Sequence, residues 1–410
     1  MVAPISFYRS INASDREPRG SSSADRVYVQ RIGVPFEYPV HFTRGVFETI
    51  NPVLHDVITR LEPDRRHRVF IVVDSGVAEA WPELDQQIEH YFRCHSEKLE
   101  LLAPAEIVPG GERAKHTPEL VDRLYGRIHD VSLDRHSFFV IVGGGAVLDM
   151  AGYVAATTHR GVRTIRIPTT VLAQNDAGVG VKNGINALGV KNYIGTFAPP
   201  FAVINDGDFI STLSDRDAIA GIAESIKVSL VRDPDFFGWL EARAQDLAER
   251  APDAMDYMIR RGAELHMTHI TESGDPFERG SARPLDFGHW VAHKLETISG
   301  HRLRHGEAVA IGMAVDSRYS VEAGLLKDVA LDRICHVIDR IGLPLWDDEL
   351  MSTDDAGQHM ILSGLEEFRE HLGGHLTITL LRDIGEGVEV HRMEESRILN
   401  ALRWLKDRWS

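Results

Sequence analysis

The sequence predicts an α/β domain built on parallel strands, followed by a mainly helical domain. Three apolar runs, at 69–74, 138–142 and 164–168, have the length of buried strands, and stretches with helical spacing of apolar residues separate them. Strands that alternate with helices are typical of a parallel sheet with helices on both faces. After about residue 208 the apolar residues mostly follow the helical period, which predicts helices.

Each element follows from its local pattern. Residues 1–25 contain a Ser-Ser-Ser run and several charges without periodic hydrophobicity, so they are predicted to be a disordered tail. An alternating pattern at 26–29 predicts a first strand, and a helix is expected at 84–92. The second domain is expected to hold helices at 214–231, 236–249, 255–271, 287–297, 307–322 and 329–341, a short strand at 375–381 and a closing helix at 394–408. The predicted domains are therefore 26–207 and 208–410.

Composition and charge exclude several classes of protein. The chain of 410 residues has 45 basic and 61 acidic residues and a net charge of −16, which argues against general binding to nucleic acid or anionic membranes. Its two cysteines, Cys94 and Cys335, are far apart in the sequence, which suggests neither a disulfide framework nor a cysteine-based zinc site and fits a reducing cytosol. No apolar run has the length of a membrane span, and the N-terminus lacks a signal peptide's apolar segment. We therefore expect a cytoplasmic protein.

A glycine-rich turn follows the second buried strand. Gly143, Gly144 and Gly145 lie between that strand and a helical segment that contains Asp149. Glycines at this point would let backbone N–H groups approach a pyrophosphate at the positive end of a helix. The spacing is not Gly-x-Gly-x-x-Gly, so the turn alone is equally compatible with a tight strand–helix connection. Asp74, which ends the first buried strand, could bind an adenosine ribose or could cap a helix.

Two histidines and a carboxylate are candidate metal ligands. Glu224 lies in a helical segment one turn before Lys227, and His289 enters another, with His293 four residues on and on the same face. His305 opens a third helical segment. Two imidazoles and one carboxylate with open coordination positions are what a catalytic zinc requires. A single histidine among 20, by contrast, is more often structural or on the surface.

A basic, glycine-rich stretch in this acidic chain predicts a phosphate site. Glycines alternate with polar residues at 176–184, and a second glycine-containing segment follows at 189–192. Lys182, Lys191 and Asn192 could cradle a phosphate, and Arg160 could add a bidentate contact. The alternative is a solvated basic hairpin, which the acidity of the whole chain makes less favourable.

Taken together, these segments resemble the sugar phosphate cyclase superfamily, whose founding member is 3-dehydroquinate synthase. The match runs in order over about residues 69–320, and more loosely to 386. The segment 109–115, Pro-Gly-Gly-Glu-Arg-Ala-Lys, resembles the family's Pro-Gly-Glu-x-x-Lys. The other matching positions are Gly143 to Asp149, Arg160-Gly161, Pro168-Thr169-Thr170, Asp176, Lys182, Lys191-Asn192, Glu224, Lys227, His289, His293 and His305-Gly306-Glu307.

The resemblance implies a fold, cofactors and roles for these residues. It implies a Rossmann-like NAD-binding domain and a helical domain that binds a divalent metal, zinc or cobalt. The implied metal ligands are Glu224, His289 and His305. The implied NAD site is lined by Asp74, Glu112, Lys115, Gly144, Gly145, Asp149, Thr169 and Thr170. The implied catalytic residues are Asp176, Lys182, Lys227 and His293, and those that bind substrate are Arg160, Lys191, Asn192, Arg283 and Asp286. Arg160 would reach the phosphate site of a neighbouring subunit, which implies a homodimer.

The implied reaction consumes no NADH overall. NAD oxidises a ring hydroxyl of a sugar phosphate, the ketone acidifies the adjacent C–H, and phosphate leaves by elimination. NADH then returns the hydride, the ring opens, and an intramolecular aldol reaction closes a carbocycle. Lys182, Lys227 and His293 would handle protons and charge.

Two departures from 3-dehydroquinate synthases concern the substrate. Those enzymes read Arg-x-x-Leu-Asn-x-Gly-His before the metal histidine, whereas here Arg283 is one residue closer and Asp286 stands in place of asparagine. The family's late Lys-Lys pair falls at Arg369-Glu370. An ionised Asp286 would repel a substrate carboxylate by about 1 to 4 kcal/mol, which favours a heptulose 7-phosphate without a carboxylate, such as sedoheptulose 7-phosphate. Pairing of Arg283 with Asp286 would cancel the repulsion and leave open 3-deoxy-D-arabino-heptulosonate 7-phosphate, the substrate of 3-dehydroquinate synthase.

Two other functions are alternatives to the cyclase. A metal-dependent polyol dehydrogenase of the glycerol dehydrogenase type shares the fold, but it would not need the cationic cluster of Arg160, Lys182, Lys191 and Asn192. A non-catalytic scaffold derived from a cyclase should have lost metal ligands, and all three candidates are present. Function is argued from the site rather than from the fold, so the cyclase is the preferred interpretation.

Overall fold

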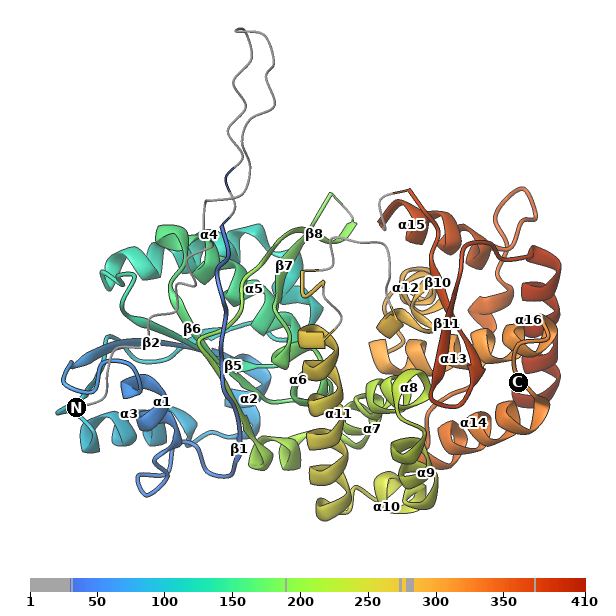
Figure 1. Cartoon of the computed structure of the whole chain (residues 1–410). Helices are drawn as coiled ribbons and strands as arrows, with labels where there is room; N and C mark the ends of the chain where they lie inside the picture. The colour runs from blue at the N-terminus through green and yellow to red at the C-terminus, as the bar shows by residue number, and fades with distance from the viewer. Residues whose placement is uncertain (1–29, 31, 189, 273–274, 278–283, 372–373) are drawn as a thin grey trace, which may run out of the picture. The chain divides into compact units, whose positions relative to one another are not determined.

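The computed structural model describes residues 30, 32–188, 190–272, 275–277, 284–371 and 374–410 (Figure 1). Within it, Tyr38–Ser410 forms one compact unit. The predicted tail at 1–25 and the predicted strand at 26–29 lie outside the described residues.

A parallel sheet forms the first half of this unit, as predicted. Seven strands of the described chain take part, in the order β1 (Val40–Thr43), β9 (Ala202–Asp206), β6 (Arg163–Pro168), β5 (Phe138–Gly143), β2 (His67–Asp74) and β3 (Leu99–Leu101), with β4 (Glu106–Val108) also on β2. All the pairings in this sheet are parallel. The three predicted apolar runs are the neighbouring strands β2, β5 and β6.

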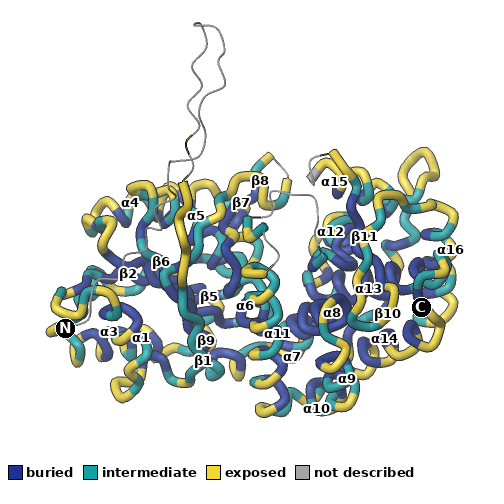
Figure 2. Tube along the Cα trace, viewed as in Figure 1, coloured by how far each residue is buried: buried dark blue, intermediate teal, exposed yellow. Residues whose placement is uncertain are grey.

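Both faces of the sheet are buried, which explains why its central strands are apolar throughout. Along β2, Val69 and Ile71 point to one face, where α1 (Val53–Thr59) and α3 (Leu84–Cys94) pack. Phe70 and Val72 point to the other face, against α4 (Pro118–Asp130) and α5 (Gly145–Thr157). Figure 2 shows these strands as part of the buried interior. This packing on both faces places the carboxyl ends of β2, β5 and β6 together at one edge of the sheet.

The second half is mainly helical, with two corrections to the predicted elements. The helix predicted at 214–231 is two helices, α7 (Asp215–Ala220) and α8 (Ile222–Arg232). Gly221 separates them, and a Cβ at this position would lie 2.6 Å from the backbone nitrogen of Leu172, so only glycine allows this close approach. The helix predicted at 236–249 is likewise α9 (Pro234–Ala242) and α10 (Ala244–Ala248).

The remaining predicted helices are present with small shifts in their bounds. They are α11 (Pro252–Glu272), α12 (His289–Ile298), α13 (His305–Glu322), α14 (Asp328–Ile341) and α16 (Glu395–Trp409). The strand predicted at 375–381 is β10 (Ile378–Asp383), which pairs antiparallel with β11 (Glu386–Val390). Elements that the sequence reading did not predict include α2 (Ser75–Ala80), α6 (Val171–Asn175) and α15 (Ser363–His371). None of the helices described is both long and apolar enough to cross a bilayer.

Candidate active site

The carboxyl ends of three sheet strands bring the predicted NAD-binding residues to one edge. Asp74 ends β2 and caps α2, because its Oδ1 accepts a hydrogen bond from Gly76 N at 2.8 Å. A Cβ on Gly110 would lie 2.1 Å from the same oxygen, so a larger residue in the loop after β4 would displace this carboxylate. Burial raises the pKa of Asp74, although hydrogen bonds from the backbone oppose the shift. Asp74 thus takes the capping role here, at a place where a ribose could also reach it.

The glycine turn forms the start of α5. Gly144 is the residue before the helix, and no side chain caps the helix start. Thr169 N donates to Gly143 O at 3.0 Å, and the side chain of Thr170 caps α6. Uncapped N–H groups at the start of a long helix are a suitable site for a dinucleotide pyrophosphate. The residues present therefore fit the NAD that the resemblance implies.

Behind this turn, η1 (Glu112–His116) carries two further predicted residues. Lys115 is buried and pairs with Asp149 of α5, at 2.7 Å between Nζ and Oδ2. Glu112 faces the hairpin instead, because its Oε2 accepts a hydrogen bond from Asn186 Nδ2 at 3.4 Å. The two residues of the 109–115 motif therefore connect α5 with the hairpin.

Three helices bring the candidate metal ligands together. Glu224 lies in α8, His289 begins α12 and His305 begins α13, and their ligand atoms all lie within 4.8 Å of one another. Glu224 Oε1 is 3.8 Å from His289 Nε2 and 3.5 Å from His305 Nε2. A tetrahedral ion with ligands at about 2.0 to 2.1 Å holds its ligand atoms about 3.4 Å apart. The spacing therefore suits a zinc-like ion.

The partners of these side chains also fit a metal. His289 Nδ1 contacts Phe287 O at 3.2 Å, and His305 Nδ1 contacts Glu296 Oε2 at 3.2 Å. These contacts direct both Nε2 atoms at Glu224. A metal-binding histidine usually makes such a contact through its other ring nitrogen, to a backbone carbonyl or a carboxylate. Both carboxylate oxygens of Glu224 are buried, and neither accepts a well-formed hydrogen bond from the described residues. Lys227, one turn later in α8, forms an ion pair with this carboxylate.

The two histidines of the cluster have pKa shifts of opposite sign. Burial lowers the pKa of His289 to about 3, and Lys227 adds to the shift. Burial also opposes a charge on His305, but Glu296 and Glu224 overcome it and raise its pKa to about 9. A field that retains a proton on a buried imidazole also favours a divalent cation, which would replace that proton.

A residue that the sequence did not single out contacts the predicted catalytic residue Asp176. His266, in α11, lies with its Nδ1 2.8 Å from Asp176 Oδ1. Despite burial, the charges of His266 and Lys227 hold the pKa of Asp176 well below its usual range. His266 belongs to no motif and is one of 20 histidines, so no sequence signal could have selected it.

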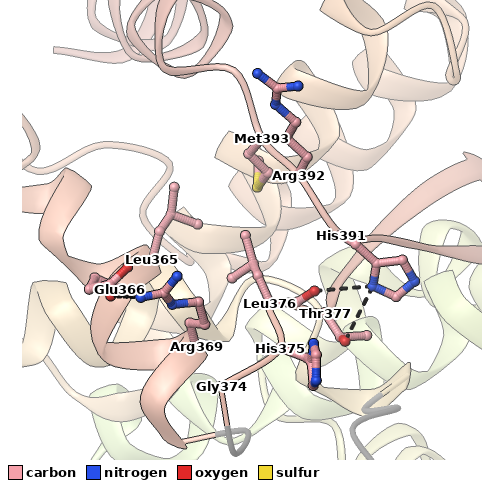
Figure 3. A pocket seen from close by; sticks show the side chains of 10 residues that line it. All are labelled: Leu365, Glu366, Arg369, Gly374, His375, Leu376, Thr377, His391, Arg392 and Met393. Atoms are coloured by element: carbon pink, nitrogen blue, oxygen red, sulfur yellow. Dashed lines mark hydrogen bonds and ion pairs between the residues drawn. The ribbon is translucent and has the colours of Figure 1, made fainter.

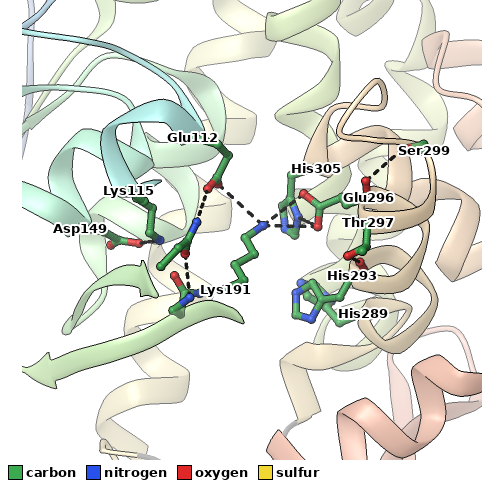
Figure 4. Close-up of polar contacts among 12 residues, drawn as sticks. Glu112, Lys115, Asp149, Lys191, His289, His293, Glu296, Thr297, Ser299 and His305 are labelled. Carbon is green, nitrogen blue, oxygen red and sulfur yellow. Dashed lines mark hydrogen bonds and ion pairs between the residues drawn. The ribbon is translucent and has the colours of Figure 1, made fainter. Parts of the chain in front are cut away.

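The predicted phosphate loop is a β-hairpin made of β7 (Lys182–Ala187) and β8 (Val190–Phe197). Lys182 and Asn192 are exposed, and the left-handed backbone of Asn192, with φ 55°, directs its N–H to Asn186 Oδ1 at 2.8 Å. Lys191 does not point to solvent, because its Nζ lies 3.1 Å from Glu296 Oε1 (Figure 4). The structure thus places one of the predicted phosphate ligands against a carboxylate.

Three other predicted substrate residues have different surroundings. Arg160 is exposed at the end of η2 (Thr158–Arg160), with a φ of 64°. Asp286 lies in η5 (Pro284–Asp286), close enough for its charge to raise the pKa of Lys227, against the larger effect of burial. Arg283 lies outside the described residues.

One hollow of the structure lies away from the metal cluster. A cavity of about 540 Å³ lies beside α15 and the ends of the β10–β11 hairpin (Figure 3). Arg369 lines it, at the position of the family's late lysines, and pairs with Glu366. The three metal-ligand candidates contribute no residue to its lining, so this hollow does not include the metal cluster.

A buried carboxylate holds the turn that leads into His289. Asp316, in α13, accepts hydrogen bonds from Gly288 N at 3.0 Å and Trp290 Nε1 at 2.8 Å. Gly288 has a φ of 80°, and a Cβ there would lie 2.7 Å from Met313 N. The glycine and the carboxylate together fix the start of α12 against α13.

Asp316 should make stability depend on pH. Burial raises its pKa to about 7, against the two hydrogen bonds, which lower it. Because the folded-state pKa lies above the unfolded one, its stabilising contribution is full below about pH 4 and is lost as the pH rises through about 7. From pH 5 to pH 8, we expect the stability of the wild-type protein relative to Asp316→Asn to fall by about 2 to 3 kcal/mol.

Urea unfolding of metal-free protein at the two pH values measures this difference. The exposed Asp328, replaced in Asp328→Asn, is the control and should show no such pH dependence. Equal differences between Asp316→Asn and wild type at pH 5 and pH 8 would contradict the prediction.

Comparisons with known proteins match most of this chain. The family model of the 3-dehydroquinate synthase N-terminal domain matches residues 105–220, and that of the C-terminal domain matches residues 221–362. The 3-dehydroquinate synthase of Caldanaerobacter subterraneus subsp. tengcongensis is 32% identical over 367 residues, covering 89% of this chain and 97% of that protein. The 2-epi-5-epi-valiolone synthase of Streptomyces glaucescens is 31% identical over 369 residues, covering 88% of each.

A solved structure extends the match to the fold. The 2-epi-5-epi-valiolone synthase of Streptomyces hygroscopicus subsp. jinggangensis, with NAD+ and Zn2+ bound, has a TM-score of 0.81 and 28% identity, covering 93% of this chain and 99% of that one. The family models and the relatives together span both halves of the described unit. The chain therefore belongs to the 3-dehydroquinate synthase family.

Proposed function

We propose that this chain is a sugar phosphate cyclase that uses NAD and a divalent metal, zinc or cobalt, to convert a heptulose 7-phosphate into a carbocycle. The observation that carries the proposal is the convergence of Glu224, His289 and His305 on one point. The uncapped start of α5 supports the NAD site, and the relative with NAD+ and Zn2+ bound supports both cofactors. We assign the metal to the three converging side chains.

Bound NAD would take up and return a hydride, and the bound metal would polarise adjacent substrate oxygens. Lys227 is well suited to stabilise negative charge on those oxygens. Although burial lowers its pKa, Glu224 and Asp176 raise it further, so it stays a cation. Burial and the two neighbouring histidines hold the pKa of His293 well below the usual value, so its imidazole is neutral and has a nitrogen lone pair available for a substrate proton. Lys182 and Asn192 on the hairpin, with Arg160, would bind the phosphate.

We infer that the substrate lacks a carboxylate, with sedoheptulose 7-phosphate as the preferred candidate. Asp286 carries its charge close to Lys227, where a substrate carboxylate would be repelled. Arg369, at the position of a family lysine, pairs with Glu366. The alternative substrate is 3-deoxy-D-arabino-heptulosonate 7-phosphate, for which Arg283 would have to neutralise Asp286.

Offering the two heptulose phosphates separately, with NAD and zinc, tests both parts of the proposal. We expect phosphate release many-fold in excess of the NAD present, and at least about tenfold faster from sedoheptulose 7-phosphate, because a repulsion of about 1.4 kcal/mol is a factor of ten. Phosphate is followed by a colorimetric assay, and the carbocycle by NMR. Faster conversion of the carboxylated sugar would overturn the substrate inference alone. NADH that accumulates with glycerol or another polyol, without phosphate release, would favour the polyol dehydrogenase.

Two further properties belong to this proposal. Leu188, Val190 and Tyr193 on the hairpin are exposed, and exposed apolar side chains that cluster favour a protein partner. This supports a homodimer in which Arg160 reaches the phosphate site of the neighbouring subunit. A mass of 45.8 kDa in sedimentation, that of one chain, would overturn it.

Both cysteines are unpaired, which supports a cytosolic location.

A further inference from the structure

Lys191 connects the hairpin of the first half with the helix that carries His289. It lies in β8, and its Nζ is 3.1 Å from Glu296 Oε1 and 3.4 Å from Glu296 Oε2. On its other side, Nζ is 3.8 Å from Glu112 Oε1. Figure 4 shows the lysine side chain reaching across between these two carboxylates. Its charge is therefore already shared by two anions.

Glu296 uses its second oxygen to hold a metal ligand. Its Oε2 lies 3.2 Å from His305 Nδ1, while His305 Nε2 faces Glu224. The Glu296 side chain is only 5% exposed, so its charge requires a cationic or N–H partner. The groups that face it are Lys191, His305 and His293. Of these, Lys191 is the permanent cation, and it comes from the other half of the unit.

We propose that Glu296 and Lys191 are positioning residues for the metal site. Glu296 accepts the Nδ1 proton of His305 and so keeps its Nε2 directed at the metal position. Lys191 holds the Glu296 carboxylate in the required orientation and thereby joins the hairpin to α12. The metal site is complete only when the hairpin lies against α12. This inference rests on the metal site proposed above.

The alternative is that Lys191 only binds substrate phosphate, as the sequence predicts. The two roles differ in what they do to the metal. If Lys191 binds phosphate, its replacement should change the KM for sugar phosphate and leave zinc affinity unchanged. If Lys191 orients Glu296, its replacement should change zinc affinity even without substrate. Metal binding by the substrate-free protein therefore separates them.

The test is a zinc titration of the full chain, prepared free of metal, against a competing chelator. We expect Glu296→Gln to bind zinc about 10- to 100-fold more weakly, the range found when a carboxylate partner of a metal-bound histidine is lost. Lys191→Met should lie near the lower end of that range, about 10-fold. In the Glu296→Gln background, Lys191→Met should change the affinity by less than about twofold, because the carboxylate through which it acts is absent. Lys191→Arg, which keeps the cation, should stay close to wild type.

A control variant, a spectroscopic readout and a substitute variant make the result specific. Glu367→Gln removes the partner of Lys294, an ion pair that joins α12 to α15 outside the site, and should leave zinc affinity and turnover unchanged. Co2+ substitution adds a spectroscopic readout, since altered d–d absorption in Lys191→Met would report a changed ligand arrangement directly. Glu296→Asp keeps the charge but shortens the side chain. It should still weaken zinc binding, and it serves in place of Glu296→Gln if that variant does not fold.

Each failure has its own signature. If wild type binds one zinc ion per chain and Lys191→Met binds it equally well with only a raised KM, this inference is wrong and the proposed function stands. Independent effects of the two substitutions that add in the double variant would likewise overturn the inference. If wild type binds no zinc or cobalt, the proposed metal site itself is wrong.

Discussion

Replacing His289 or His305 with alanine is expected to abolish turnover and to lower the zinc content of the purified protein. Each substitution leaves two protein ligands where the geometry provides three. Metal polarisation contributes several kcal/mol to the stabilisation of charge in such reactions, so the loss in kcat should be about 10³-fold or more. Elemental analysis measures the metal, and phosphate release measures turnover.

The matched control for this prediction is His336→Ala. His336 is an exposed histidine of α14, so it tests for general effects of losing an imidazole and should leave both measurements unchanged. Full zinc content in both His289→Ala and His305→Ala would show that the metal, if present, is bound elsewhere.

Arg166→Met is expected to lower the free energy of unfolding more than any surface substitution in this chain. Arg166 lies in β6 with a fully buried side chain. Its guanidinium donates hydrogen bonds of 2.8 to 3.1 Å to Gly178 O, Gly180 O, Lys182 O and Asn183 Oδ1. Methionine would fill much of the same space but donates none of them. At about 1 to 3 kcal/mol for each buried acceptor left without a partner, the loss should be about 4 kcal/mol or more.

The same substitution should also affect the site. The four acceptors of Arg166 lie in residues 178–183, which follow Asp176 and enter β7, so the segment that carries Lys182 loses its anchor. We therefore expect a raised KM for the sugar phosphate together with the lower unfolding free energy in urea.

Arg163→Met provides the comparison on the same strand. Arg163 pairs with Glu62 in a partly exposed position, with 23% of its side chain accessible, so its loss should cost about 1 kcal/mol or less. If Arg166→Met were no less stable than Arg163→Met, the bonds to residues 178–183 would have no part in holding the loop.

The sequence by itself determined the class of the fold, because the central strands are buried on both faces. Such strands are continuous apolar runs, so β2, β5 and β6 could be recognised without any knowledge of their neighbours. Strands β3 and β4 have three residues each, too few to carry a periodic signal. The break at Gly221 depends on the approach of Leu172, a contact that the local pattern does not contain.

The order of motifs along the chain also determined the family, and with it the candidate residues. The spacing of Glu224, His289 and His305 could be read from the sequence, and the structure brings the three together. Their meeting point depends on three helices that begin at different places in the chain, so the local pattern alone could not place it.

Only the tertiary structure decided which groups surround these residues. Lys191 was predicted as a phosphate ligand, yet its partner Glu296 lies 105 residues away in the sequence. The pairs Asp176–His266 and Asp316–Trp290 similarly join different helices or loops. A side chain's type and spacing specify what chemistry it can perform, whereas its charge partner is set by which elements pack together. The partners of Lys191 and Asp176 come from other elements, because a buried charge is stable only where packing supplies an opposite charge or hydrogen bonds.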